Sequence, residues 1–179
     1  IPGWYRGLAD NLINRFYASP PGEIQFSTAA GGFSGISYGR GHFTCADDEA
    51  VVVEFTPPAG TLYWSVHLGT HYWESLDWDV HQCSLNGHQA KLDPDGKFRG
   101  VIALRDPAVP NWLDPAGHRK GLICCRVVRG DGIPEVSMQR VKLSDLRDHL
   151  HPSTSHVDAV ERALVIRDRM IGTQRRFRE

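Results

Sequence analysis

The chain of 179 residues lacks the features that mark several large classes of protein. No apolar run approaches the roughly 18 residues that a membrane-spanning helix needs. The formal net charge is -1, so no global attraction to nucleic acid or to a membrane surface is expected. None of the four cysteines forms a C-x-x-C pair, which argues against a zinc ribbon. We therefore predict no membrane span, no nucleic-acid partner and a cytoplasmic location in which the thiols stay reduced.

Two familiar catalytic patterns are also incomplete. The segment 32–35 (GFSG) resembles a nucleophile elbow, but the pattern G-x-S-x-G needs glycine at the next position, where this chain has Ile36. The glycines between residues 31 and 41 are not followed by G-K-[ST], so a phosphate-binding loop is not predicted. Glycines at strand bends explain this passage better than a catalytic loop does.

Strong β-patterning fills the middle of the chain, from about residue 35 to residue 143. The β-branched run 49–56 ends at two prolines, and the sequence at 93–96 (DPDG) predicts a tight turn. About eight short strands with closely spaced turns predict a mainly β fold, a jelly-roll-like antiparallel β-sandwich. The expected strands are 35–45, 49–56, 61–69, 78–84, 88–92, 97–104, 119–128 and 135–142.

Both ends of the chain are predicted to be helical. Apolar residues at helical spacing indicate a helix over residues 3–18, which Pro20 stops. Ser144 begins a short helix, and Ser155 begins a longer one that runs to about Arg176. Its many arginines fit either a solvated helix face or an anion-binding surface. The buried stripe of this last helix is expected to comprise Val157, Val160, Leu164 and Ile171.

These segments predict one domain over residues 1–179, since its length suffices for a core of its own. Residues 1–31 are expected to form a helical lead-in, 32–143 the β-sandwich and 144–179 a helical tail. The chain begins at Ile1 without a signal segment, so we expect it to be part of a longer protein.

The stretch from residue 62 to residue 89 concentrates side chains that titrate, ligate or stack. In strands, His67 and His71 share one face, as do Asp79 and His81. If residues 61–72 and 77–85 pair as a hairpin, these groups meet, and imidazole with carboxylate suits zinc, iron or nickel. A divalent-metal site is one interpretation, and histidines that give a sandwich wall its polar tips are the other. The hairpin register decides between them.

The loop from Arg105 to His118 is about a dozen residues long, with three prolines between two strands. Loops of this length are often functional when ordered, so Trp112 is either a structural plug or the lid of a pocket. Aromatic groups beside convergent polar groups are typical of small-molecule sites. The residues predicted to line such a site are Trp64, His67, His71, Asp79, His81, Arg105, Asn111 and Trp112.

Some of these residues carry a family resemblance. The segments SLN (84–86), DPDG (93–96), DP (106–107) and especially NWLD (111–114), together with Gln89, look like the bacterial domain-of-unknown-function 1214 family. The resemblance covers the region from Gly35 to Val128. It implies a jelly-roll-like β-sandwich that forms the C-terminal half of a larger bacterial protein, often after a second domain of unknown function. It implies no catalytic residues.

Three functions are compatible with this pattern. The first is an accessory domain that binds a small ligand, or a partner such as an upstream domain or subunit of the same protein. The second is a metal-dependent hydrolase or oxygenase in which His67, His71, Asp79 and His81 hold a cation that activates water. The third is a structural module that forms a homo-oligomer through the apolar stripes at the two ends of the chain.

Overall fold

The fold is seen in a computed structural model of the chain. It describes Gly3, Gly7, Asn14 and residues 17–20, 22–27 and 35–177. The helix predicted over residues 3–18 lies largely outside this described part. The rest of the predicted helical lead-in differs from expectation, because residues 25–27 form a short strand, β1 (Gln25–Ser27).

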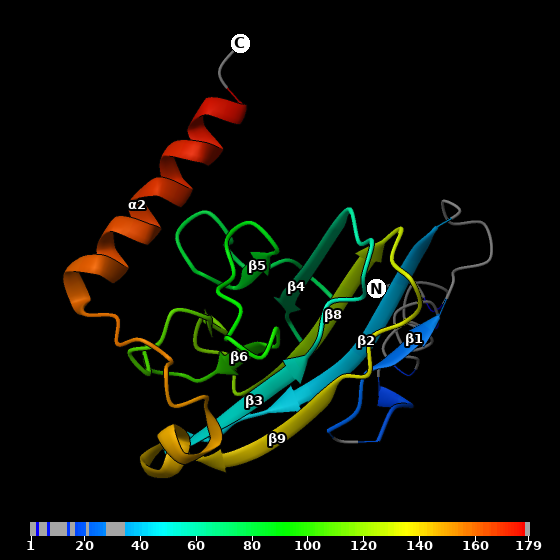
Figure 1. Cartoon of the computed structure of the whole chain (residues 1–179), viewed down its shortest axis with the longest axis horizontal. Helices are drawn as coiled ribbons and strands as arrows, with labels where there is room; N and C mark the ends of the chain where they lie inside the picture. Colours follow the sequence, from blue (N-terminus) through cyan, green and yellow to red (C-terminus); the bar gives the residue numbers. More distant parts are fainter. Residues whose placement is uncertain are drawn as a thin grey trace.

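Two β-sheets form the body of the molecule (Figure 1). The five-stranded sheet is antiparallel throughout, in the order β1-β2-β8-β4-β5, with β2 (Ile36–Thr44), β8 (Lys120–Val128), β4 (Tyr63–Gly69) and β5 (Ser84–Asn86). The four-stranded sheet has the order β7-β6-β3-β9, with β7 (Trp112–Leu113), β6 (Phe98–Ile102), β3 (Glu49–Phe55) and β9 (Ser137–Lys142). Only the short β6–β7 pairing is parallel. The prediction of a mainly β fold is confirmed.

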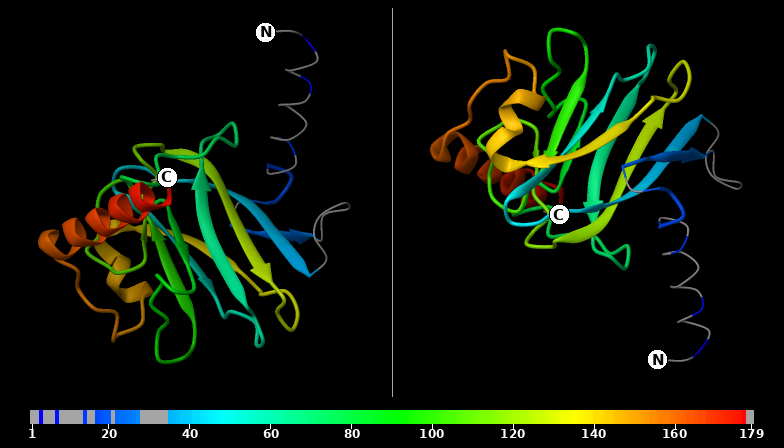
Figure 2. Two further views of the ribbon diagram at one scale, coloured as in Figure 1. Left: turned by 90° about the horizontal axis from the view of Figure 1, so that it is seen from above. Right: turned by 90° about the horizontal axis from the view of Figure 1, so that it is seen from below.

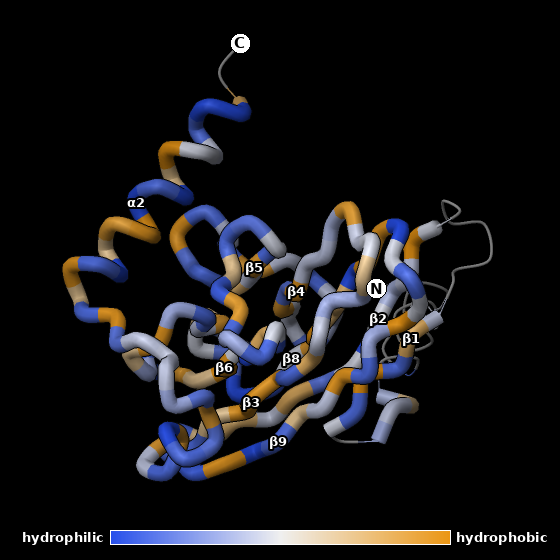
Figure 3. Tube along the Cα trace, viewed as in Figure 1, coloured by the Kyte–Doolittle hydropathy of each residue, from blue (hydrophilic) through white to orange (hydrophobic). Residues whose placement is uncertain are grey.

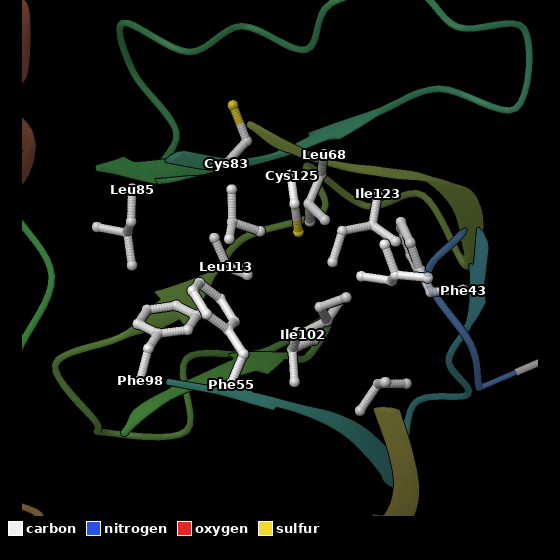
Figure 4. Close-up of a cluster of buried hydrophobic side chains, with 14 of the residues drawn as sticks. Phe43, Phe55, Leu68, Cys83, Leu85, Phe98, Ile102, Leu113, Ile123 and Cys125 are labelled. Atoms are coloured by element: carbon white, nitrogen blue, oxygen red, sulfur yellow. The ribbon is translucent and has the colours of Figure 1, made fainter. Parts of the chain in front are cut away.

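Alternation along the strands builds the main core from both sheets. On β4, Trp64, Val66 and Leu68 are buried in it, while the residues between them point to the opposite face of the sheet. Phe55 and Phe98 enter the same cluster from the four-stranded sheet (Figure 4). Burial of each such side chain contributes about 1.5–3 kcal/mol to folding, so this shared core holds the two sheets together.

β3 is buried on both faces, because a second apolar cluster covers the outer side of the four-stranded sheet. Ala50 and Val52 point into this cluster, where they meet Trp112 and residues that follow β9. Two-sided burial explains why β3 reads as a continuous apolar run instead of an alternating one. The other members of the cluster are Val101, Ala103, Val109, Val141, Leu146 and Leu150.

Two helical elements follow the strands. A short 3-10 helix, η1 (Leu143–His149), lies where a short helix was predicted, and α2 (Ala159–Arg176) follows it. α2 begins after Asp158 and not at Ser155, because Asp158 and Glu161 form a complete capping box. No helix among the described residues is long and apolar enough to cross a membrane.

The predicted buried stripe of α2 is largely wrong: Val157 precedes the helix, and both Val157 and Ile171 are only half-buried. Val160 is 68% exposed and Leu164 is 51% exposed, whereas the buried residue of this helix is Arg162. Hydrophilic and hydrophobic residues alternate along α2 in Figure 3, and Figure 2 shows the helix beside the sheets, far from β1. Ion pairing decides this orientation, because the Arg162 guanidinium reaches the carboxylate of Asp106 on the body.

The strands predicted at 78–84 and 88–92 do not form. Residues 77–81 make a tight turn, in which the Asp77 carbonyl oxygen accepts hydrogen bonds from the amides of Val80 and His81. β5 begins only at Ser84, where it pairs with β4 in the register His67 to Ser84 and Ser65 to Asn86. The predicted hairpin therefore shrinks to three residue pairs, because local turn hydrogen bonds use the intervening backbone.

Close packing of backbones in the five-stranded sheet can be tested at Gly121. A Cβ atom there would lie 2.4 Å from the Gly69 carbonyl oxygen and 2.9 Å from the Phe43 ring. We expect Gly121→Ala to lower the free energy of unfolding by about 1–3 kcal/mol, measured by urea denaturation. Gly172→Ala is the matched control, because nothing lies within 4 Å of that Cβ position and alanine stabilises a helix by about 1 kcal/mol. Equal stability of the two variants would contradict the close approach.

Candidate functional site

The eight residues predicted to bind a ligand do not share one surface. Trp64 is buried in the main core, with its ring centroid 5.2 Å from that of Phe55 and 5.1 Å from that of Phe98. Arg105 is at the surface, where its Nη2 donates to the Asp47 carbonyl oxygen at 3.0 Å. The placement of Trp64 follows from its inward position on β4, which makes it a core residue.

The side chains of the loop residues Asn111 and Trp112 hold the loop in place through hydrogen bonds to neighbouring backbone. The Asn111 amide donates to the carbonyl oxygens of Lys91 and Arg99, and its Oδ1 accepts from the Lys91 amide. Trp112 is buried, and its Nε1 donates to the Ala103 carbonyl oxygen at 2.9 Å. Trp112 is thus part of the second core and not the lid of a pocket, because its indole finds a hydrogen-bond partner inside.

The four residues considered as metal ligands are also separated. His67 points outward from β4. His71 lies in the turn after β4, where its Nδ1 forms a hydrogen bond with the Tyr17 hydroxyl. His81 Nδ1 lies 2.7 Å from an Asp114 carboxylate oxygen, and Asp79 caps its own turn. Across residues 35–177 and the other described positions, no three His, Cys, Asp or Glu side chains could hold one metal ion. The shared-face argument does not apply, because Asp79 and His81 lie outside a strand.

A cavity lies between α2 and β5. It has a volume of about 1120 Å³, and residues of α2 form one wall while β5 and the segments around it form the other. Trp78 supplies an aromatic side chain that is 40% exposed. Aromatic and polar groups around a concave space are typical of a small-molecule site. We call this space the α2 cleft; its polar lining includes Gln82, Ser84, Asn86, Gln89, Arg162 and Arg169.

Arg162 anchors α2 at one end of the α2 cleft. Its guanidinium donates to Asp106 at 2.8 Å, to Gln82 Oε1 at 3.1 Å and to the Val109 carbonyl oxygen. Gln82 is almost completely buried, and its amide donates to the Trp112 carbonyl oxygen at 2.7 Å. The charge of Arg162 is therefore compensated within the protein, which gives it a structural role.

Arg169 is two helical turns farther along the same face and lacks such compensation. Its Nη2 donates to the Ser84 carbonyl oxygen, and its Nη1 lies 3.4 Å from the Trp78 carbonyl oxygen. The buried Nε has no hydrogen-bond partner, and no carboxylate among the described residues pairs with this guanidinium. Burial lowers the pKa of Arg169, as expected for a cation held away from water. The Arg169 guanidinium is thus available to an anion, in a cleft that Glu161 and Asp168 also line.

A second polar surface covers the outer face of the five-stranded sheet, the side away from the main core. His67 of β4 lies opposite Cys124 of β8, and Arg126 lies two residue pairs away on the same face, opposite Ser65. Burial, and then the positive charge of Arg126, lowers the pKa of His67. Burial raises the pKa of Cys124 to about 11. Both groups are therefore neutral near pH 7, and the arginine is the charged member of the set.

Of the residues that shape these two surfaces, the sequence singled out His67 but not Arg126, Arg169 or Gln82. Arg162 and Arg169 belong to a basic tail whose charges fitted either a solvated face or an anion-binding surface. Their separation of seven residues does place them on one side of a helix, which is a usable signal. No pattern in the sequence marks Gln82 as buried, because its partners come from a distant loop.

Comparisons with known proteins bear on the fold and not on the chemistry. No family model and no curated protein matches the chain. The crystal structure of an uncharacterised protein from Burkholderia cenocepacia has a TM-score of 0.70 and 29% identity, and the match covers 76% of this chain but 39% of that protein. A Vibrio parahaemolyticus protein has a TM-score of 0.47 and 20% identity, over 58% of this chain and 30% of that one. The chain thus spans less than half the length of either protein.

The electrostatic coupling between Arg126 and His67 can be measured directly. We expect Arg126→Gln to raise the pKa of His67, because a positive charge that disfavours the imidazolium form is removed. NMR titration of the imidazole signals gives this pKa. Arg119→Gln is the control, because Arg119 is an exposed arginine of the same segment that pairs with Asp47. An unchanged His67 pKa in Arg126→Gln would contradict the coupling.

Proposed function

We propose that this chain is a ligand-binding β-sandwich domain of a larger bacterial protein, and that the α2 cleft binds a small molecule through a carboxylate group. The proposal keeps the first of the three functions expected from the sequence but moves the site away from Trp64 and Trp112. The observation that carries it is the uncompensated guanidinium of Arg169.

A buried cation without an ionic partner is costly, because its desolvation is not repaid by a neighbouring charge. A ligand carboxylate beside the part of the Arg169 side chain that lines the α2 cleft would repay this cost. The planar guanidinium matches the planar carboxylate group, since two parallel hydrogen bonds can form between them. The exposed ring of Trp78 offers an apolar surface for the rest of such a ligand.

The same proposal includes membership of the domain-of-unknown-function 1214 family and a jelly-roll arrangement of the two sheets. The roles of Asn111 and Trp112 support the resemblance, because both side chains make hydrogen bonds that hold the loop onto the sheet. Residues with such roles are expected within a family signature. The likeness to part of a longer Burkholderia protein supports a domain that works inside a larger chain.

The proposal predicts that Arg169 controls the binding of a carboxylate. Benzoate added to the 179-residue chain should shift the NMR signals of the Trp78 indole and of the Arg169 side chain. We expect Arg169→Gln to weaken this binding by roughly tenfold or more, since a hydrogen bond to a charged group contributes about 1.5–3 kcal/mol.

Arg167→Gln is the matched control, because Arg167 is an exposed arginine on the same helix and does not line the α2 cleft. Circular dichroism checks that both variants keep their helix content. The proposal fails if benzoate leaves the Trp78 and Arg169 signals unchanged, or if Arg169→Gln binds benzoate as tightly as Arg167→Gln does.

A further inference from the structure

The outer face of the five-stranded sheet presents a regular grid of polar side chains. In one row of paired residues, Ser65, Arg126 and Tyr38 lie side by side on β4, β8 and β2. The next row contains His67, Cys124 and Arg40. Residues directly opposite each other in antiparallel strands point to the same face, so these six side chains share one surface.

The charge of this face is one-sided. The outward positions of the five strands carry Arg40, Lys120 and Arg126 but no aspartate or glutamate. Arg126 makes no ion pair with any residue that the structure describes. Positive charge without nearby carboxylates attracts an anion to this surface.

Three neighbouring donors on this face lack a partner within the described part of the chain. The Ser65 hydroxyl, the His67 imidazole and the Arg126 guanidinium make no hydrogen bond there with another side chain or backbone group. Ser65 is buried and His67 is half-buried, but neither has a polar side-chain atom that is both sealed from solvent and unpartnered, so a ligand can reach these atoms from outside. Polar groups in such positions normally have partners, which points to a ligand that supplies them.

Aromatic rings hold and flank this set of donors. The Arg126 guanidinium lies 5.3 Å from the centroid of the Tyr38 ring, which fixes its position on the sheet. The Trp73 side chain makes a hydrogen bond with the Cys124 thiol, so its indole lies beside the three donors. Tyr63, 43% exposed, points to the same face one row beyond Ser65 and offers a ring for an apolar or aromatic group.

We propose that Ser65, His67 and Arg126 form a binding site for a phosphate monoester on the outer face of the five-stranded sheet. The three terminal oxygens of a phosphate monoester can accept from the hydroxyl, the imidazole N–H and the guanidinium together, and its negative charge is larger than that of a carboxylate. The site adjoins the α2 cleft along β5, because Ser84 lies opposite His67 and also lines that cleft. It uses different residues, so it does not depend on the proposed function of the cleft.

Phenyl phosphate is the probe for this site, and benzoate is its matched comparison because it has the same ring with a carboxylate. Isothermal titration of the 179-residue chain should give saturable binding of phenyl phosphate, with chemical-shift changes at the His67 imidazole. We expect Arg126→Gln to weaken this binding by roughly tenfold or more and Ser65→Ala to weaken it less. Arg126 is exposed, so its replacement should leave the fold intact.

Two controls separate this site from general charge effects and from the α2 cleft. Arg119→Gln, which removes an exposed arginine that pairs with Asp47, should leave phenyl phosphate binding unchanged. Arg169→Gln should also leave it unchanged while it weakens benzoate binding. The proposal is overturned if phenyl phosphate does not bind, if Arg126→Gln binds it as tightly as the unaltered chain, or if only Trp78 and Arg169 respond to it.

Discussion

The contact on which the rest of this structure depends is the aromatic cluster between the two sheets. Trp64 comes from the five-stranded sheet, and Phe55 and Phe98 come from the four-stranded sheet, with centroids between 5.1 and 5.2 Å apart. Edge-to-face and tilted pairs of this kind add to the large apolar area that each ring buries. Once these rings meet, period-two alternation determines which residues of every neighbouring strand point outward. The polar face around His67 is therefore a direct consequence of where Trp64 packs.

Electrostatics, and not apolar burial, determines how α2 lies against the sheets. A helix that carries both an apolar stripe and an arginine stripe has two possible orientations, and here Arg162 is the inward residue. Its partners Asp106, Gln82 and the Val109 carbonyl oxygen satisfy its hydrogen-bond donors in a buried position. The orientation that satisfies Arg162 also brings Arg169 to the body, where it bonds to carbonyl oxygens and pairs with no carboxylate of the described residues. The cleft proposed to bind an anion thus arises from the same choice of helix face.

The two surfaces illustrate how a sheet protein generates sites without a catalytic motif. On the outer face, β4, β8 and β2 place one donor each per row, and their regular spacing brings Ser65, Arg126 and His67 together. In the α2 cleft, a single helix supplies the cation and a neighbouring strand supplies the polar wall. Each arrangement combines a short local spacing, Ser65 with His67 or Arg162 with Arg169, with partners from distant segments, so the local pattern alone does not reveal it.

The sequence by itself determined the strands with continuous β-branched or alternating runs, since each of these strands is specified by its own side chains. Those that lie within a few residues of their predicted places are β2, β3, β4, β6, β8 and β9. The sequence did not reveal β1 and β7, because such short strands form only against a partner strand that is distant in the chain. It also did not reveal that residues 78–84 and 88–92 form no strand; at residues 77–81, turn hydrogen bonds use the backbone instead. The histidine cluster was visible as composition, but only the tertiary structure separated His67, His71, Asp79 and His81 and made Trp64 and Trp112 core residues. Strand register and helix orientation determine where these side chains lie, and both are set by contacts between segments far apart in the chain.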